Sequence, residues 1–433
     1  MDAPVEGAPL AGAGFAPEAA FLDCVHCGLC HSACPTYVEL GTEADSPRGR
    51  IHLMHALQDG TLPLDAAAVQ HLDLCLGCRG CETACPSGVH YGALIEAARP
   101  WIEERYRRPV TTRLRRGLAL TILPYPRRLR LALAPLHFLE RLGVLAVART
   151  LLRQLPARWR YRASLLPDPL PAPAAVPLET PARGVERTCV QLLVGCVMPE
   201  LFGDTVRSTL EVLARNGCRI LAPADQVCCG ALSLHAGDRA TAVRLACANV
   251  DAFEPRAAGP AIPLVVNASG CGAMMKEYAA LLADEPAHAE RAARLAARVE
   301  DATELLVRLP LAAPRAAAPA RRVAYHDPCH LAHAQGVRQP PRALLASLPG
   351  VTLVSMADED LCCGSAGHYN VMHPDLAARL AARKVEAMRA SAVDVIATAN
   401  AGCALQLEAG LRAAGVALRV RHVLDLLADA YRG

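Results

Sequence analysis

Residues 24–35, CVHCGLCHSACP, and residues 75–86, CLGCRGCETACP, share one cysteine pattern. Three cysteines stand with two residues between neighbours, and a fourth follows after three more residues, directly before a proline. Three thiolates at this spacing wrap one corner of an iron–sulfur cubane, and in two-cluster ferredoxins the fourth cysteine ligates the other cluster. The spacing therefore predicts two [4Fe-4S] clusters and a role in moving electrons. The predicted ligands are Cys24, Cys27, Cys30 and Cys85 for the first cluster and Cys75, Cys78, Cys81 and Cys34 for the second.

Composition and the first residues indicate the compartment and the kind of cysteine chemistry. The chain has 433 residues and 19 cysteines, whereas a secreted disulfide scaffold would be short and dense in cysteine throughout. Two zinc sites are the alternative, but zinc-binding cysteines usually form two C-x2-C pairs separated by a longer spacer. The first 20 residues contain no basic residue and no continuous apolar stretch, which argues against a signal peptide. We therefore expect a cytoplasmic protein.

The chain divides into segments of contrasting composition. Residues 166–182 hold six prolines in seventeen positions, and residues 310–320 are rich in alanine and proline, as is typical of linkers. Inside the cysteine-rich region we expect helices after Pro47 and after Pro86. The expected order is a flexible tail (1–20), a helical two-cluster ferredoxin-like domain (21–106), a basic segment of amphipathic helices (107–165), a proline-rich linker (166–186), a first α/β repeat (187–309), a second linker (310–321) and a second α/β repeat (322–433).

The basic segment has an unusual charge balance. Residues 105–162 contain fifteen arginines and one acid, Glu140, although the whole chain carries a net charge of only +3. We interpret this stretch as a surface for an anionic membrane or an acidic partner subunit. The alternative is composition, because the chain has almost no lysine and arginine is its default cation. No segment has the continuous apolar length that spanning a bilayer requires.

The C-terminal half contains an internal duplication. Cys196 recurs as Cys329, the CCG at 228–230 recurs at 362–364, and the GC at 270–271 recurs at 402–403. The offsets are 133, 134 and 132 residues, so the copies stay in register. Short apolar runs alternate with alanine-rich helical stretches, which predicts parallel α/β sheets. The expected strands are residues 189–194, 219–221 and 264–266 in the first copy and 322–325, 351–354 and 393–398 in the second.

Each copy should gather four cysteines at one edge of its sheet. Ligands of parallel α/β sheets bind beyond the carboxyl ends of the strands, and cysteines follow the expected strands in both copies. The CCG sequences precede expected helices, whose N-terminal ends favour thiolate over thiol. Such a set suits a further cluster, a metal ion or a redox-active thiol group. The candidate ligands are Cys196, Cys228, Cys229 and Cys271 in the first copy and Cys329, Cys362, Cys363 and Cys403 in the second.

Histidines gather at one of these cysteines. His326, His330 and His333 surround Cys329, and imidazole can ligate a metal or relay a proton. The alternative is a hydrogen-bonded turn at a strand end, and the sequence does not separate the two. Polar residues inside the cluster loops, such as Arg79, are expected to be solvated.

These residues resemble the CCG (cysteine-rich) domain proteins, which include heterodisulfide reductase subunits, anaerobic glycerol-3-phosphate dehydrogenase and the iron-sulfur subunits of bacterial glycolate oxidase. The resemblance is strongest to the last group and covers nearly the whole chain, apart from the tail and the arginine-rich middle. It is carried by residues 24–37 (CVHCGLCHSACPTY), 46–51 (SPRGRI), 81–92 (CETACPSGVHYG), 266–272 (VNASGCG), 324–338 (AYHDPCHLAHAQGVR) and 361–367 (LCCGSAG).

The resemblance implies a subunit of glycolate dehydrogenase that transfers electrons and does not itself oxidise substrate. A flavin-containing partner would oxidise glycolate to glyoxylate in a complex with a second related subunit. The clusters would pass electrons to a quinone-type acceptor on the inner face of the cytoplasmic membrane. The alternatives are an iron–sulfur subunit for lactate or glycerol 3-phosphate, or a heterodisulfide-reductase-like subunit with chemistry at the CCG site.

Departures from the family pattern limit what the CCG sites can hold. Heterodisulfide reductases supply a fifth cysteine in each repeat, where this chain has Met274 and Gln406. A five-thiolate, noncubane cluster is therefore not expected. The chain shows no dinucleotide or phosphate-binding glycine loop, no nucleic-acid-binding motif and no catalytic acid–base pattern. We assign it no catalytic residue.

Overall fold

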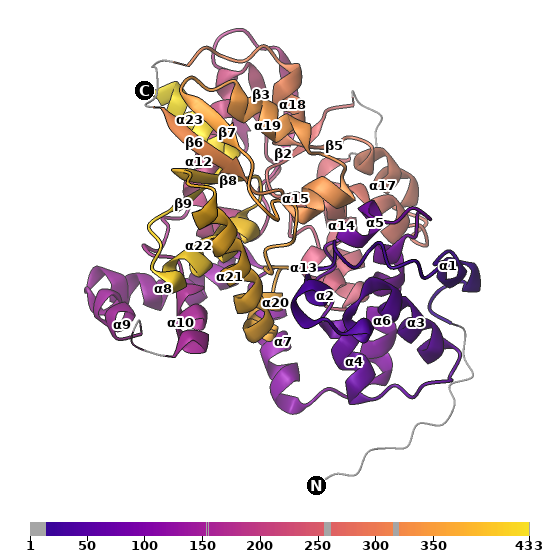
Figure 1. Cartoon of the computed structure of the whole chain (residues 1–433). Coiled ribbons are helices and arrows are strands. Elements are labelled where there is room, and N and C mark those ends of the chain that lie inside the picture. The colour runs from indigo at the N-terminus through magenta and orange to yellow at the C-terminus, as the bar shows by residue number, and fades with distance from the viewer. Residues whose placement is uncertain (1–13, 153, 155, 255–260, 315–319, 433) are drawn as a thin grey trace.

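The computed structural model describes residues 14–152, 154, 156–254, 261–314 and 320–432 (Figure 1). Residues 1–13 of the expected tail and 315–319 of the expected second linker lie outside the described residues. The prediction that the tail extends to residue 20 is wrong. Phe15 packs against Phe21 and Trp101, with ring centroids 6.0 and 5.3 Å apart, and helix α1 (Glu18–Leu22) follows. Burial of these aromatic rings fixes the segment to the first domain.

The first domain is helical, as expected. Its elements are α1, α2 (Pro35–Leu40), a 3-10 turn at Glu43–Asp45, α3 (Pro47–Gln58), α4 (Ala66–Asp73), α5 (Gly80–Thr83) and α6 (Tyr91–Arg105). The Ser46 hydroxyl accepts a hydrogen bond from the Gly49 amide at 3.0 Å and caps α3. Helices α3 and α6 are the two expected after the prolines, and they contact each other across Met54, Leu94 and Ile95, which are at most 2% exposed. This core supports both cysteine loops.

The basic segment forms short helices interrupted near prolines. They are α7 (Val110–Ile122), α8 (Pro126–Arg141), α9 (Val144–Leu152) and α10 (Ala157–Ser164). Helix α10 packs against the second repeat, where the Tyr161 hydroxyl donates to Gln406 at 2.8 Å. Within the described residues, no single helix is long and apolar enough to cross a bilayer, and α8 and α9 meet that test only as a pair bent by 94°.

Each repeat contains one sheet. The first has the order β1-β3-β2-β4-β5, with β1 (Glu179–Thr180), β2 (Thr188–Leu193), β3 (Cys218–Leu221), β4 (Leu264–Val266) and β5 (Val299–Asp301). The second has the order β7-β6-β8-β9, with β6 (Arg321–Tyr325), β7 (Val351–Val354), β8 (Val395–Thr398) and β9 (Arg419–His422). All pairs are parallel except β1 with β3. The six predicted strands are present to within two residues, whereas β1, β5 and β9 were not predicted.

The helices of the two repeats build one shared core. The first repeat has α11 (Met198–Leu201), α12 (Gly203–Arg215), α13 (Ala231–His235), α14 (Arg239–Phe253), α15 (Ser269–Lys276), α16 (Tyr278–Leu281), α17 (Ala289–Ala296) and α18 (Ala302–Arg308). The second has a turn of π-helix at His330–Ala334, then α19 (Gln339–Ala346), α20 (Tyr369–Met372), α21 (Pro374–Ala390), α22 (Ala401–Ala414) and α23 (Val423–Arg432). Helix α12 contacts α23, and α18 contacts α19. Helix α12 of the first copy corresponds to α19 of the second, since both follow the first cysteine, and α18 corresponds to α23, since both end their copy. Each of the two contacts thus pairs the same two kinds of helix, and the packing is approximately two-fold symmetric.

Candidate cluster and metal sites

The first cysteine loop surrounds a cavity between α3 and the second loop. The cavity is lined by Cys24, Cys27, Cys30 and Cys85, with Cys81 beside them and with Ile51, Val89 and Tyr91 as apolar walls. His26 and Gly28 have positive φ values of 54° and 82°, which lets the loop turn its cysteines inward. The four cysteines predicted for the first cluster thus lie around one space. Four convergent thiols in an apolar setting fit a [4Fe-4S] cluster, although their ligation of it stays a prediction.

The second loop forms a separate cavity. It is lined by Cys34, Cys75, Cys78 and Cys81, which is the set predicted for the second cluster. Cys34 reaches this cavity because it immediately precedes α2, where Pro35 starts the helix and turns the chain away from the first loop. The structure therefore brings together the crossed set of cysteines, including the member that is distant in sequence.

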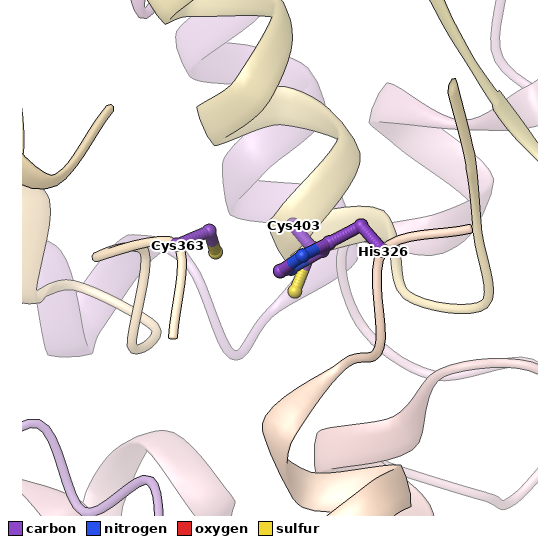
Figure 2. Close-up of side chains that lie close together, drawn as sticks. All are labelled: His326, Cys363 and Cys403. Carbon is purple, nitrogen blue, oxygen red and sulfur yellow. The ribbon is translucent and has the colours of Figure 1, made fainter. Parts of the chain in front are cut away.

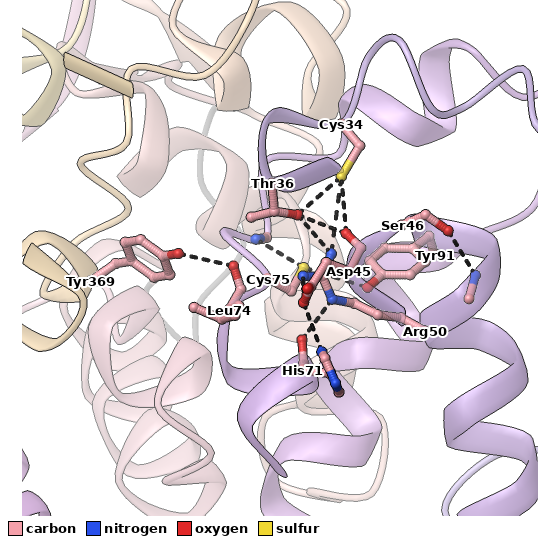
Figure 3. Close-up of polar contacts among 12 residues, drawn as sticks. Cys34, Thr36, Asp45, Ser46, Arg50, His71, Leu74, Cys75, Tyr91 and Tyr369 are labelled. Atoms are coloured by element: carbon pink, nitrogen blue, oxygen red, sulfur yellow. Dashed lines mark hydrogen bonds and ion pairs between the residues drawn. The ribbon is translucent and has the colours of Figure 1, made fainter. Parts of the chain in front are cut away.

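A buried arginine lies beside the second cavity (Figure 3). Arg50 is 1% exposed. It donates to the Thr36 hydroxyl at 2.9 Å and to the His71 carbonyl at 2.7 Å, and it pairs with Asp45 at 3.3 Å. Its Nη1 is 3.9 Å from the Cys34 sulfur. Sequence reasoning missed this residue, although it lies in the SPRGRI stretch directly after the first loop.

Arg50 changes the electrostatics of the cluster cysteines. Burial alone would raise the pKa of Cys75, but the positive charges of Arg50 and Arg99, together with hydrogen bonds from the Tyr91 hydroxyl and the Gly77 amide, outweigh burial and lower it. A lowered thiol pKa favours the thiolate that binds iron. In Cys34, burial outweighs the same guanidinium and the pKa is raised. The chain thus supplies a fixed positive charge at the second cavity.

The expectation that Arg79 is solvated is wrong. Its side chain is 12% exposed and forms ion pairs with Glu277 and, at 3.3 Å, with Glu96. Since Glu277 directly follows α15, this loop arginine connects the ferredoxin-like domain to the first repeat.

The four cysteines of the first repeat lie together. Cys228 has hydrogen-bonding interactions with Cys196 and Cys229, which lower its pKa, and Cys229 also interacts with Cys271. The pKa values of Cys196 and Cys229 are raised well above the usual value. Donation from its neighbours therefore favours the thiolate form of Cys228. Gly230 caps α13 directly after the CCG sequence, as expected.

The second repeat gathers the equivalent cysteines. The Cys329 and Cys362 sulfurs are 3.9 Å apart, and Cys363 interacts with both Cys362 and Cys403. The prediction that a helix directly follows this CCG sequence is wrong, because α20 begins only at Tyr369. Residues 365–368 intervene, so no helix N-terminus abuts these thiols.

Gln406, which stands in the second repeat where heterodisulfide reductases have a fifth cysteine, makes structural hydrogen bonds. Gln406 is fully buried and accepts hydrogen bonds from Tyr161 at 2.8 Å and from Asn370 at 3.0 Å. Its amide donates to the Ala377 carbonyl at 3.1 Å. Gln406 therefore joins α10 to the second repeat. In the first repeat, the fifth position is the buried, apolar Met274.

The three histidines near Cys329 have separate roles. His326 lies close to Cys363 and Cys403 (Figure 2). His330 contacts the Gly77 carbonyl at 3.0 Å, and His333 contacts Thr83 at 2.9 Å. The latter two histidines therefore hold the second cysteine loop against the second repeat.

This docking brings two cysteine sites into contact. Cys78 of the second cluster cavity has a hydrogen-bonding interaction with Cys362, which raises the pKa of Cys78. The Tyr369 hydroxyl also donates to the Leu74 carbonyl at 3.0 Å. The second cavity thus adjoins the CCG site of the second repeat, an arrangement that the sequence did not predict.

Comparison with known proteins agrees with this architecture. A 4Fe-4S dicluster domain matches residues 20–89, and a cysteine-rich domain matches residues 190–276 and 323–408. The chain is 38% identical to a probable glycolate oxidase iron-sulfur subunit of Bacillus subtilis, over 95% of this chain and 94% of the relative. It is 35% identical to the glycolate oxidase iron-sulfur subunit of Escherichia coli, over 94% and 93%. The chain belongs to the glycolate oxidase iron-sulfur subunit family. It is therefore a subunit of an oxidoreductase complex that carries iron–sulfur clusters.

A second group of relatives covers less of the chain. Lactate utilization protein A of Shouchella clausii is 28% identical over 55% of this chain and 98% of its own length. At that length the match cannot include both the ferredoxin-like domain and the two complete repeats. The family assignment therefore rests on the relatives that span the whole chain.

Proposed function

We propose that this chain takes electrons from a flavin-containing subunit that oxidises glycolate to glyoxylate, and passes them through its clusters to a quinone-type acceptor. A two-electron flavin must discharge in single-electron steps, and thiolate-bound clusters accept electrons singly. The observation that carries the proposal is the pair of cavities, each of which is lined by the four cysteines predicted to bind one cluster, in a chain whose full-length relatives are named glycolate oxidase iron-sulfur subunits.

Contacts between the parts support an order of transfer. Cys81 lines both cluster cavities, and Cys78 contacts Cys362 of the second repeat. The proposed order is first cluster, second cluster, then the second repeat. When bound, the clusters supply one-electron chemistry, while the chain provides thiolates, apolar walls and the charge of Arg50.

Glycolate is preferred over lactate as the substrate of the complex. The relatives named for glycolate oxidase match about 95% of this chain, whereas the relatives named for lactate utilization match about half. None of the relatives named above is named for glycerol 3-phosphate oxidation or heterodisulfide chemistry. The two missing fifth cysteines, at Met274 and Gln406, also argue against the heterodisulfide alternative.

The test separates substrate oxidation from electron transfer. The purified, flavin-free chain should not reduce a dye when given glycolate, and activity should appear when the flavin subunit is added. Dye reduction by the isolated chain would contradict the proposal. Greater activity of the complex with lactate or glycerol 3-phosphate than with glycolate would contradict the choice of substrate.

We propose further that α7, α8 and α9 rest on the inner face of the cytoplasmic membrane. Each helix carries exposed apolar side chains at helical spacing, together with several arginines on α7 and α8 and with Arg149 on α9. They are Val110, Leu114 and Leu118 on α7, Leu131 and Phe138 on α8, and Val144, Val147 and Leu151 on α9, all at least 46% exposed. Exposed apolar stripes flanked by cations suit the interface of an anionic bilayer.

The arginines of this surface differ in availability. Arg130 pairs with the buried Glu200 and Arg116 pairs with Glu103, so neutralising either would disturb folding. Arg113 and Arg127 are exposed and have no ion pair among the described residues. They are therefore the positions to change.

Vesicle binding tests the membrane contact. The double change Arg113→Gln and Arg127→Gln should weaken binding to anionic liposomes by about 30-fold, because each cation near such a surface contributes about 1 kcal/mol. The control is Arg389→Gln with Arg419→Gln, two exposed arginines in the second repeat. Equal binding by both double variants would contradict the membrane contact. If the double change at Arg113 and Arg127 abolishes binding of the flavin subunit and the control change does not, the surface binds that partner.

A further inference from the structure

Three buried ligand atoms converge in the second repeat. One side-chain atom from each of His326, Cys363 and Cys403 lies within 4.8 Å of the other two (Figure 2). The three residues are 0%, 1% and 4% exposed. His326 directly follows β6, Cys363 lies in the segment after β7, and Cys403 occupies the first turn of α22 after β8. All three therefore lie at the carboxyl edge of one parallel sheet, where ligands of such sheets bind.

The His326 imidazole makes no hydrogen bond of good geometry in the described structure, although the side chain is fully buried. The backbone of Glu359 interacts with the ring, but neither Nδ1 nor Nε2 is well satisfied by a protein group. Burying a polar group without a partner costs free energy, and buried polar groups in folded proteins are nearly always satisfied. A metal ion bound by one nitrogen would remove part of that cost.

The backbone and its neighbours hold the imidazole in place. The His326 amide donates to the Ala397 carbonyl at 2.9 Å. The adjacent Asp327 carboxylate accepts two hydrogen bonds from Arg342, at 2.8 and 2.7 Å. This paired arginine fixes the strand end and leaves the His326 ring without a competing acid. The side chain is thus positioned beside the two sulfurs before any ligand binds.

Ligand spacing favours one metal ion over a four-iron cluster. A tetrahedral zinc ion lies about 2.3 Å from sulfur and about 2.0 Å from nitrogen, so its ligand atoms are about 3.5–3.8 Å apart. Around a cubane the cluster itself lies between the thiolates, which must stand farther apart. Among the described residues, no three cysteines of the ferredoxin loops or the first repeat come within the 4.8 Å seen here.

We propose that the second CCG site holds one Zn²⁺ ion through Cys363, Cys403 and His326, with the fourth ligand from the adjacent Cys329 and Cys362 pair. Mixed thiolate and imidazole donors in a tetrahedral arrangement are typical of zinc. The site does not depend on which substrate the flavin partner oxidises.

The first repeat supplies an internal comparison. His326 lies three residues before Cys329, and the residue three before Cys196 is Leu193. Leu193 is 2% exposed and packs in the apolar core around Cys196. Among the described residues, no histidine groups with the four thiols of the first repeat, so the two CCG sites are chemically different.

Metal analysis of the full-length chain, purified anaerobically with its flavin partner, tests the site. We expect about one zinc per chain beside the cluster iron, and zinc-edge X-ray absorption with sulfur neighbours and one histidine nitrogen. His326→Leu, which copies the first repeat, should lose the nitrogen signal and at least 90% of the zinc at a fixed chelator concentration, with the cluster iron unchanged. His235→Leu is the control, because the His235 Nδ1 is also buried without a hydrogen bond and lies 3.6 Å from a Glu96 carboxylate oxygen, away from these thiols, and this variant should keep the zinc.

Three results would overturn the proposal. Wild-type protein without stoichiometric zinc would exclude a zinc ion from this site. A zinc shell of sulfur alone would exclude His326 as a ligand. Unchanged zinc content in folded His326→Leu would also exclude His326 as a ligand. If that variant does not fold, the zinc-edge spectrum of the wild-type protein decides whether a histidine nitrogen binds the zinc.

Discussion

Replacing Arg50 with glutamine should lower the reduction potential of the second cluster and destabilise the ferredoxin-like domain. Arg50 is 1% exposed, and its Nη1 lies 3.9 Å from the sulfur of Cys34. A positive charge there stabilises the reduced cluster, which carries one more negative charge than the oxidised cluster. Removing the charge therefore makes the cluster harder to reduce.

The size of both effects follows from the geometry. At 3.9 Å and an effective dielectric constant of about 20, two unit charges interact by about 4 kcal/mol, which corresponds to about 180 mV for one electron. The added electron spreads over the whole cluster, so we expect a decrease of roughly half that, about 90 mV. The change also leaves Asp45, which is 3% exposed, with His71 as its remaining partner. Loss of one partner of a buried ion pair costs about 3 kcal/mol of unfolding free energy.

Redox titration followed by EPR measures the effect on each cluster. Arg48→Gln is the control, because Arg48 is 30% exposed and contacts the first loop through the His26 carbonyl at 2.7 Å. Solvent screens its charge, so its change should be smaller and confined to the first cluster. Arg50→Lys should keep most of the potential while losing stability. If folded Arg50→Gln has unchanged potentials, or if Arg50→Lys lowers the potential as much, the electrostatic argument fails.

Three further predictions concern the cluster ligands, the CCG site and a buried carboxyl group. Cys34→Ser should remove the EPR signal of the second cluster and Cys30→Ser that of the first; loss of the same signal in both would contradict the crossed assignment. Cys362→Ala should slow quinone reduction by the complex while both ferredoxin-like clusters remain, and wild-type turnover would refute that. Burial raises the pKa of Glu96 to about 7, so the folded state binds this proton more tightly than the unfolded state does. The unfolding free energy should therefore decrease by about 2 kcal/mol as the pH rises from about 4.5 through 7 and the folded state loses that proton. Glu96→Gln should abolish that decrease in thermal melts at pH 5 and 8, and an unchanged pH dependence would exclude Glu96 as its source.

Local patterns in the sequence predicted most of the architecture. The cysteine spacing is a local property, and both predicted sets lie around their own cavities. Central strands such as β4 are apolar and fully buried, so alternation with helical stretches revealed them. The missed strands β5, with sequence VED, and β9, with sequence RVRH, are edge strands rich in charge. They form because a neighbouring strand offers hydrogen bonds, which no local pattern records.

The rest of the site depends on contacts between distant segments. No local pattern marks Arg50 for burial, because a charged residue on a helix is usually exposed. Only the surrounding Thr36, Asp45 and His71 explain its burial. The contact of Cys78 with Cys362 likewise requires the ferredoxin-like domain to dock on the second repeat. The three histidines near Cys329 could not be separated by role until that docking was known.

Docking also explains why the two copies of the duplicated repeat need not remain equivalent. The second repeat meets the cluster loop through His330, His333 and Cys362, whereas the first repeat meets it through the ion pair of Arg79 with Glu277. In the proposed path, an electron leaving the second cluster therefore reaches the second CCG site first. That site is also the one with a buried histidine among its thiols, where the first repeat has Leu193. A substitution in the second copy therefore changes the groups next to the second cluster cavity, whereas the first copy meets the ferredoxin-like domain through the ion pair of Arg79 with Glu277 and the contact of α13 with α6.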